Sequence, residues 1–143
     1  MEYFPDSNRK TEAQLMIFNL QDKLVMKDYL TAKLYYDLGT YTGNASYTAD
    51  MRINGNNFLA CITTAQNALK DYPYTSMRED ISILLLRAKY KLGSESVLDK
   101  KEERMRETID EYYAFKNEFP ESKYMKEVEA IYKDASKYVK ELN

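Results

Sequence analysis

The chain has 143 residues, of which 44% are hydrophobic, and this is enough for one domain with a sizeable core. Its 21 basic and 23 acidic residues nearly cancel, so the charge balance argues against binding to nucleic acid or to an anionic membrane surface. Histidine is absent, which removes the commonest metal ligand and the usual general base, and nothing in the composition favours a cofactor or an enzymatic activity.

A short turn motif occurs three times and contains all three prolines of the chain. The copies are Phe4-Pro5-Asp6-Ser7, Tyr72-Pro73-Tyr74-Thr75 and Phe119-Pro120-Glu121-Ser122. Proline ends a preceding helix, and the hydroxyl side chain accepts hydrogen bonds from the first amides of the next one. Each copy therefore predicts a helix, a stop and a new helix. Because no helix precedes the first copy, we expect further sequence before Phe4 in the natural protein.

Residues 8–38 contain neither glycine nor proline and carry two apolar stripes at helical spacing. The stripes are out of phase with each other and are separated at Lys27, before Gly39 supplies a left-handed stop. We predict one long helix with a bend or change of facing near Lys27, or alternatively two helices joined there. The stripes consist of Ala13, Met16, Leu20 and Leu24, followed by Leu30, Leu34 and Leu38.

Thr42 to Asn57 is rich in glycine and asparagine and predicts an inserted loop. The dipeptide Asn54-Gly55 is a weak hairpin signal there, because its flanking residues alternate poorly. Apolar residues then recur every three or four positions from Phe58 to Tyr72, which predicts an amphipathic helix.

The helix expected after the second turn begins with a capping-box match, in which Ser76 is followed three residues later by Glu79. Its apolar face extends to Leu92 and is broad enough to predict burial on two sides. Gly93 is expected to end it. A polar link, Ser94 to Lys100, follows.

The remaining sequence predicts two more amphipathic helices, Glu102 to Phe119 and Tyr124 to Leu142, each with a charged outer face. Together these elements predict a single all-α domain over residues 1–143, of about five helices. Antiparallel helix pairs whose apolar faces are completed by their neighbours favour a tetratricopeptide-like arrangement in a right-handed superhelical stack.

An ordered set of residues resembles the C-terminal half of BamD, a family of tetratricopeptide-like lipoproteins of the outer-membrane β-barrel assembly machine of Gram-negative bacteria. The resemblance covers roughly Phe4 to Leu92. The residues that carry it are Phe4-Pro5-Asp6-Ser7, Leu20-Gln21-Asp22-Lys23-Leu24, Ala32, Tyr35-Tyr36, Gly39, Tyr41, Ala60, Leu69-Lys70-Asp71-Tyr72-Pro73 and Thr75.

This resemblance implies a protein-binding scaffold and not an enzyme, at the periplasmic face of the outer membrane. The partners it implies are the POTRA domains of BamA and the other lipoproteins of the assembly machine, with no nucleic acid. Contact with the membrane would be made only through an N-terminal lipid anchor that this chain lacks. Two features depart from the family pattern, namely the inserted loop and the sequence after Leu98.

The predicted partner-binding residues are polar or aromatic and lie in or near the loop and along the following helices. They are Tyr41, Tyr47, Arg52, Lys70, Arg78, Arg87 and Lys91. The alternative function is that of another periplasmic tetratricopeptide adaptor, similar to the Tol-Pal coordinator, which also has aromatic-Pro-x-Ser turns.

Several residues that suggest a site are better explained by packing. Cys61 is expected to be buried, because it lies in an apolar helix and has no histidine to activate it. Four tyrosines on or beside apolar stripes are expected to pack between helices, as are three methionines. These are Tyr35, Tyr72, Tyr112 and Tyr138, and Met16, Met77 and Met105.

Overall fold

The computed structural model describes residues 3–39, 57–96 and 98–139. These residues form five helices and no strand, which confirms the all-α prediction. In chain order the helices are α1 (Tyr3–Leu38), α3 (Asn57–Asp71), α4 (Arg78–Ser94), α5 (Leu98–Glu118) and α6 (Met125–Ser136).

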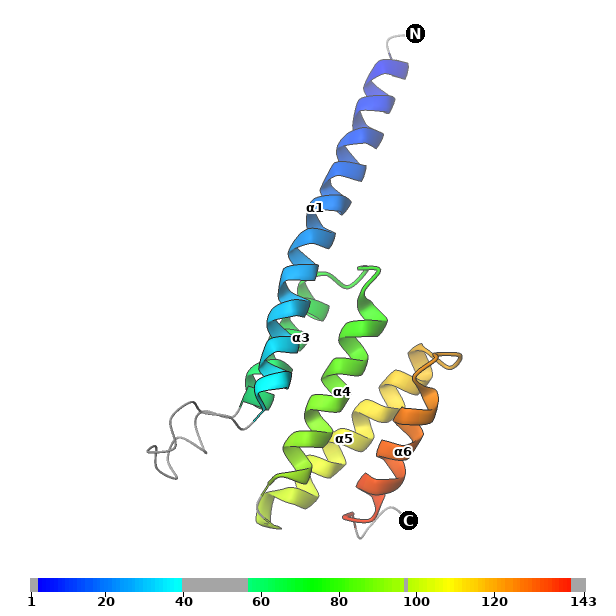
Figure 1. The fold of residues 1–143 in the computed structure, drawn as a ribbon. Coiled ribbons are helices and arrows are strands. Elements are labelled where there is room, and N and C mark those ends of the chain that lie inside the picture. The colour runs from blue at the N-terminus through cyan, green and yellow to red at the C-terminus, as the bar shows by residue number, and fades with distance from the viewer. Residues whose placement is uncertain (1–2, 40–56, 97, 140–143) are drawn as a thin grey trace, which may run out of the picture.

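The helices form two rows (Figure 1). Each helix packs against the next one described along the chain, and in addition α4 contacts both α1 and α6. Helices α1, α4 and α6 therefore lie in one row, with α3 and α5 in the row behind them. In the first row, α4 and α6 each follow a copy of the aromatic-proline turn. The first copy, Phe4-Pro5-Asp6-Ser7, lies within α1, which begins at Tyr3, so the turn predicted there is wrong.

Helix α1 is continuous through Lys27, so the alternative of two helices is wrong. Only its C-terminal half packs against other helices, where Val25 and Ala32 are fully buried, and its N-terminal half projects beyond the bundle (Figure 1). The leucine stripes predicted to face the core point outward instead: Leu20 is 59% exposed and Leu34 is 57% exposed. Their spacing identified an apolar face of the helix but not which face the bundle covers.

The two glycines that were expected to end helices have different roles. Gly39 has φ +56° and ends α1, as predicted, and a Cβ there would lie 3.0 Å from Cζ of Phe58. Gly93 does not end α4, which continues through Ser94. Instead a Cβ at Gly93 would lie 3.1 Å from Sδ of Met105, so glycine here allows α4 and α5 to approach closely.

The second and third turns have the same hydrogen bonds. The amide of Thr75 donates to the carbonyl of Tyr72 at 3.2 Å, and the amide of Ser122 donates to the carbonyl of Phe119, also at 3.2 Å. Each hydroxyl then accepts from the amide two residues later, at 3.2 Å for Thr75 and 3.1 Å for Ser122. The amides bound are those of Met77 and Tyr124, which directly precede α4 and α6, and neither helix has a side-chain cap. The prediction that the hydroxyls bind the first amides of the next helix is therefore wrong by one residue.

The capping box predicted at Ser76 is wrong. Helix α4 begins at Arg78, and no side chain caps its first residues in the way that the Ser76 and Glu79 pattern requires. The hydroxyl of Thr75 already accepts from the amide of Met77, one residue earlier than the predicted cap position. Glu79 instead accepts a hydrogen bond from the hydroxyl of Ser122, in the neighbouring turn.

Helix α4 separates two parts of the core, which confirms the prediction that it is buried on two sides. Ile81 and Leu84 belong to a cluster shared with α1 and α3, whereas Ile83 and Leu86 belong to one shared with α5 and α6. Cys61 is fully buried in the first cluster, as predicted.

The tyrosine prediction is confirmed at three positions of four. Tyr35 and Tyr72 pack half-buried against the first core cluster, and Tyr112 is buried with its ring 4.4 Å from that of Tyr132. Tyr138 is 41% exposed, and its ring instead lies 4.7 Å from the ammonium of Lys101.

The methionine prediction is confirmed at Met105, which is fully buried, and at Met77, which packs partly buried against the first core cluster. It is wrong at Met16, which is 67% exposed on α1.

Helix boundaries also differ from those expected. Helix α5 begins four residues early, at Leu98, and α6 ends at Ser136, although residues 140–143 lie outside the described chain.

The turn geometry generates a prediction about stability. Replacing Thr75 by alanine removes the hydroxyl that accepts from the amide of Met77, and we expect a loss of about 1 kcal/mol in the free energy of unfolding. Thr75→Ser keeps the hydroxyl and should retain most of the stability. Urea denaturation followed by circular dichroism measures both. Ser76→Ala is the matched control, and an equal loss there would show that the hydrogen bond from the amide of Met77 to Thr75 is not the source of the stability.

Candidate protein-binding surface

Of the four predicted partner-binding residues that the structure describes, two lie close together. Arg87 and Lys91 lie one turn apart on α4, whereas Lys70 is exposed near the end of α3 and Arg78 is the first residue of α4. The three predicted residues in and beside the loop lie outside the described residues. These are Tyr41, Tyr47 and Arg52.

Arg87 and Lys91 line a hollow of about 280 Å³ on the first row of helices. Helix α4 forms its floor, and α1 and α6 contribute one wall each. We call this hollow the α4 groove. Its lining residues are Tyr36, Arg87, Tyr90, Lys91, Glu127, Ala130 and Ile131.

A bidentate ion pair fixes the centre of the α4 groove. Arg87 Nε lies 2.6 Å from Glu127 Oε1, and Arg87 Nη2 lies 2.7 Å from Glu127 Oε2. The hydrogen bond between them raises the pKa of Arg87 and lowers that of Glu127, so both stay charged at neutral pH. The guanidinium also lies 5.3 Å from the ring centroid of Tyr124. The side chain of Arg87 is thus held in one position before any ligand binds.

Two tyrosines supply hydroxyl groups to the walls of the groove. Burial raises the pKa of the Tyr36 phenol, which therefore remains protonated at neutral pH. Tyr90 donates its hydroxyl to Asp134 on α6, and this hydrogen bond raises its pKa as well. Tyr36 also packs edge-on against Phe58, with centroids 5.7 Å apart, so its ring is fixed by the contact between α1 and α3.

Lys91 is the exposed cation of the groove. Among the described residues no carboxylate lies within ion-pair distance of its ammonium group, whereas the charge of Arg87 is balanced by Glu127. The groove therefore carries a net positive charge. An exposed ammonium, fixed phenols and the apolar side chains of Ala130 and Ile131 suit non-covalent binding of a peptide segment that has a carboxylate.

The groove lacks a candidate nucleophile. The nearest reactive side-chain type, the thiol of Cys61, is fully buried in the core, and burial raises its pKa to about 12. A thiol with such a pKa is protonated at neutral pH and is a poor nucleophile. Among the residues described, no group of three or more acidic or cysteine side chains could hold a metal ion.

Arg78, one of the predicted partner-binding residues, forms contacts within the fold. Its guanidinium pairs with Glu118 at the end of α5 and donates to the carbonyl of Pro73 at 3.1 Å. It thereby ties the second turn to α5.

A hollow of about 640 Å³ lies beside Arg78. Tyr74 is one of its lining residues, and the side chain of Tyr74 is 94% exposed. Tyr74 was missed by the sequence analysis, although an aromatic residue replaces the acidic spacer of the other two turns.

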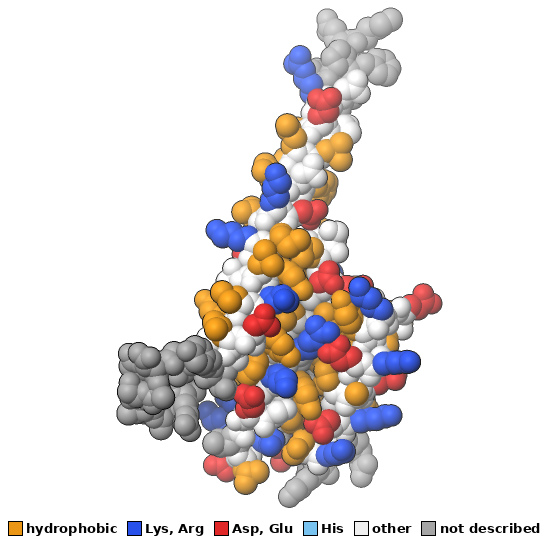
Figure 2. Space-filling view, viewed as in Figure 1, with side chains coloured by type: hydrophobic (Ala, Val, Ile, Leu, Met, Phe, Trp, Pro, Cys, Tyr) orange, Lys and Arg blue, Asp and Glu red, His pale blue; other side chains and the backbone are white. Residues whose placement is uncertain are grey.

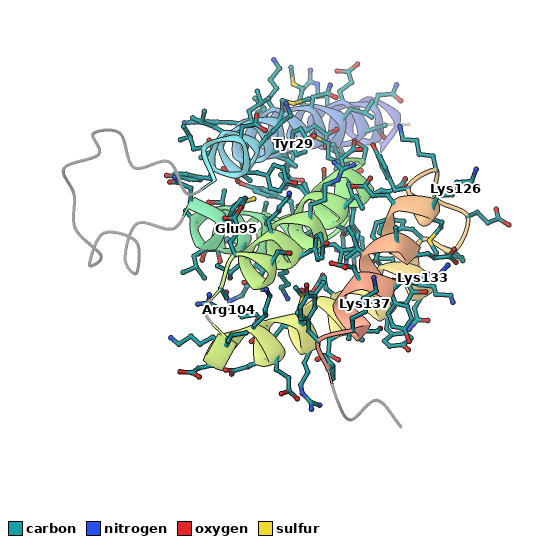
Figure 3. All side chains as sticks on the ribbon, turned by 60° about the horizontal axis from the view of Figure 1, so that its bottom comes forward. Tyr29, Glu95, Arg104, Lys126, Lys133 and Lys137 are labelled. Atoms are coloured by element: carbon teal, nitrogen blue, oxygen red, sulfur yellow. The ribbon has the colours of Figure 1, made fainter. Side chains whose placement is uncertain are left out.

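Helix α6 carries a second basic feature that the sequence analysis missed. Lys126, Lys133 and Lys137 are exposed at positions that share one face of the helix (Figure 3). The acidic residues Glu127 and Asp134 bind Arg87 and Tyr90 of α4, and Asp134 also lies 3.9 Å from the ammonium of Lys137. Lys126 and Lys133 are therefore the lysines of this face that form no ion pair among the described residues.

The comparisons with known proteins do not assign this surface. No protein-family model matches the sequence, and no curated protein is similar enough to be identified as a relative. None of the described helices is long and apolar enough to cross a membrane.

The ion pair at the centre of the groove generates a pH prediction. Folding lowers the pKa of Glu127. The ion pair therefore stabilises the fold at pH values above the ordinary pKa of glutamate, about 4.3. This stabilisation is lost as the pH falls through the pKa that Glu127 has in the folded chain. A double-mutant cycle of Arg87→Met and Glu127→Gln should give a coupling of about 1 kcal/mol at pH 7, since both groups are partly exposed.

The cycle is measured by urea denaturation at neutral and at acidic pH. The same cycle on Lys33 and Asp37, an exposed pair on α1 with atoms 3.8 Å apart, serves as the control and should give a much smaller coupling. A coupling between Arg87 and Glu127 that persists unchanged at pH 2 would contradict the assignment.

Proposed function

We propose that this chain is a non-catalytic protein-binding scaffold of the BamD type, which docks on the periplasmic POTRA domains of BamA. In this proposal the helices form a tetratricopeptide-like, right-handed superhelical stack, and the partner binds along the row formed by α1, α4 and α6. The protein acts at the periplasmic face of the outer membrane, together with the other lipoproteins of the assembly machine.

The observation that carries the proposal is the repetition of one turn geometry. The turns after α3 and α5 have the same two types of hydrogen bond at nearly equal distances, and each is followed by a helix of the first row. Such repetition is typical of helical-repeat proteins, which present extended surfaces to other proteins. The BamD-like residues of the sequence then select one class among them.

The α4 groove supports a binding role because its side chains are already ordered. Arg87 is held by Glu127, Tyr36 by Phe58 and Tyr90 by Asp134. A ligand that binds there orders few additional side chains, which reduces the entropic cost of association. An enzyme is not favoured by any described group of side chains.

The alternative is a periplasmic adaptor similar to the Tol-Pal coordinator, which the aromatic-Pro-x-Ser turns favour equally. The two proposals differ in their partner. Binding to the POTRA domains supports the BamD-like function, whereas a correctly folded chain that does not bind them favours the alternative.

The test is isothermal titration of the chain with the POTRA domains of BamA from the same organism. We expect micromolar or tighter binding. Lys91→Glu should weaken it about tenfold, because the substitution reverses the exposed charge of the groove. Lys126→Glu is the charge-matched control on the outer face of α6 and should have little effect.

Equal weakening by the two substitutions would show that only the net charge matters and would contradict binding in the groove. A double variant, Tyr47→Ala with Arg52→Ala, tests in the same titration the predicted residues that lie outside the described chain. Circular dichroism of each variant establishes that a loss of binding is not a loss of folding.

A further inference from the structure

The side of α1 that faces away from the bundle is apolar over most of its length. Its six large side chains are between 38% and 67% exposed, although each is of a type that is usually buried. We call this surface the outer face of α1. It consists of Met16, Leu20, Leu24, Leu30, Leu34 and Leu38.

The six apolar side chains of the outer face lie along one stripe, in which Lys23, Lys27 and Thr31 also fall. At 100° per residue its six positions fall within an arc of roughly 120° on the helix surface. Val25 and Ala32, which are buried against the bundle, lie on the opposite side. Figure 2 shows hydrophobic side chains exposed along α1, both beside the bundle and on the part that projects from it. Every described side chain from Asn8 to Leu24 is exposed.

The exposed apolar area of the outer face is similar to the area that one protein buries in a protein–protein interface. The six side chains expose on the order of 600 Å² per copy, which approaches the roughly 800 Å² that each partner buries in a stable complex. Soluble monomers rarely expose an apolar patch of this size without a partner. With flanking residues such as Ala13 and Ile17, two such faces contain enough area for a specific dimer.

The pattern of the outer face is symmetric about Lys27. Leu24 and Leu30 each lie three residues from Lys27, Leu20 and Leu34 each lie seven, and Met16 and Leu38 each lie eleven. A dimer with twofold symmetry requires a surface that is complementary to itself, so that residue i contacts j and j contacts i. A helix whose apolar positions are mirrored about one residue meets this requirement when two copies pack antiparallel.

We propose that the outer face of α1 is a homodimer interface in which two copies of α1 pack antiparallel, with Lys27 at the twofold axis. Leu20 then packs against Leu34 of the other copy, and Leu24 packs against Leu30. The projecting half of each α1 lies on the bundle-attached half of the other. The exposed apolar side chains of both halves are buried by one contact.

In this register the ammonium group of Lys27 lies beside the ammonium group of Lys27 from the other molecule. This contact makes the register testable. The two flexible side chains extend to water at the edges of the contact, as lysines do beside apolar surfaces. Their repulsion weakens the dimer, so added salt should strengthen the association rather than weaken it. The α4 groove, which lies on the inner side of α1, remains open in the dimer.

Sedimentation velocity of the purified chain over micromolar concentrations tests the association. The wild-type chain should be dimeric, and Leu20→Lys combined with Leu34→Lys should be monomeric. The matched control is Leu15→Lys, which changes a leucine of equal exposure, 58% against 59% for Leu20, that lies outside the stripe. The control should remain dimeric. A monomeric wild-type chain would overturn the proposal and assign the face to a different polypeptide.

Charge reversal at the axis tests the register. Lys27→Glu places two carboxylates together at the axis, so it keeps the like-charge repulsion and should dimerise about as tightly as the wild type does. An equimolar mixture of the two chains pairs an ammonium with a carboxylate, and we expect its dissociation constant to be about tenfold lower than that of either chain alone. If the mixture associates no more tightly than its components, Lys27 does not lie at a twofold axis and the proposal is wrong.

Discussion

The fold depends on the burial of α4 from two sides. All four of the other described helices contact α4, and no other helix has this property. Its fully buried residues Ile81 and Leu86 face different core clusters, and burial of each such side chain contributes roughly 1.5–3 kcal/mol. A helix with an apolar surface this broad is stable only between two layers. The pairs α1–α3 and α5–α6 are therefore held in fixed positions relative to each other.

The aromatic-proline turns set the direction in which these pairs follow one another. In the second and third copies of the turn, the hydroxyl side chain also contacts a carboxylate on the preceding helix of the first row. Thr75 contacts Asp22 of α1 at 3.4 Å, and Ser122 donates to Glu79 of α4. The same side chain thus shapes the turn before a helix and positions that turn against the neighbouring helix. This dual role explains why the motif precedes both α4 and α6.

The sequence was sufficient to predict elements whose signals are local. The turns, the stop at Gly39 and the burial of Cys61 follow from backbone chemistry and from the apolar pattern around each residue. Signals that depend on tertiary contacts were misread. Gly93 matches a helix stop in sequence, but in the structure the side chain of Met105 packs where a Cβ at Gly93 would lie, and no local pattern reveals this contact.

The candidate site was predictable only in part for the same reason. Arg87 and Lys91 were predicted as polar partner-binding residues on the helix that follows the second turn. Two further residues complete the groove. Glu127 lies forty residues after Arg87 in the sequence, and Tyr36 lies fifty-one residues before it. Nothing in their local sequence indicates that they meet. The groove exists only because α1 and α6 both pack against α4.

The outer face of α1 shows a further limit of periodicity. A stripe of leucines at helical spacing has the same appearance whether it is buried within its own chain or exposed for a partner. On α1 the bundle buries Val25 and Ala32 and packs the rings of Tyr29, Tyr35 and Tyr36, and it leaves the leucines outside. The exposed leucines offer apolar area for a contact that must form between separate molecules. The groove and the outer face lie on different sides of α1, so one helix can serve two contacts at once.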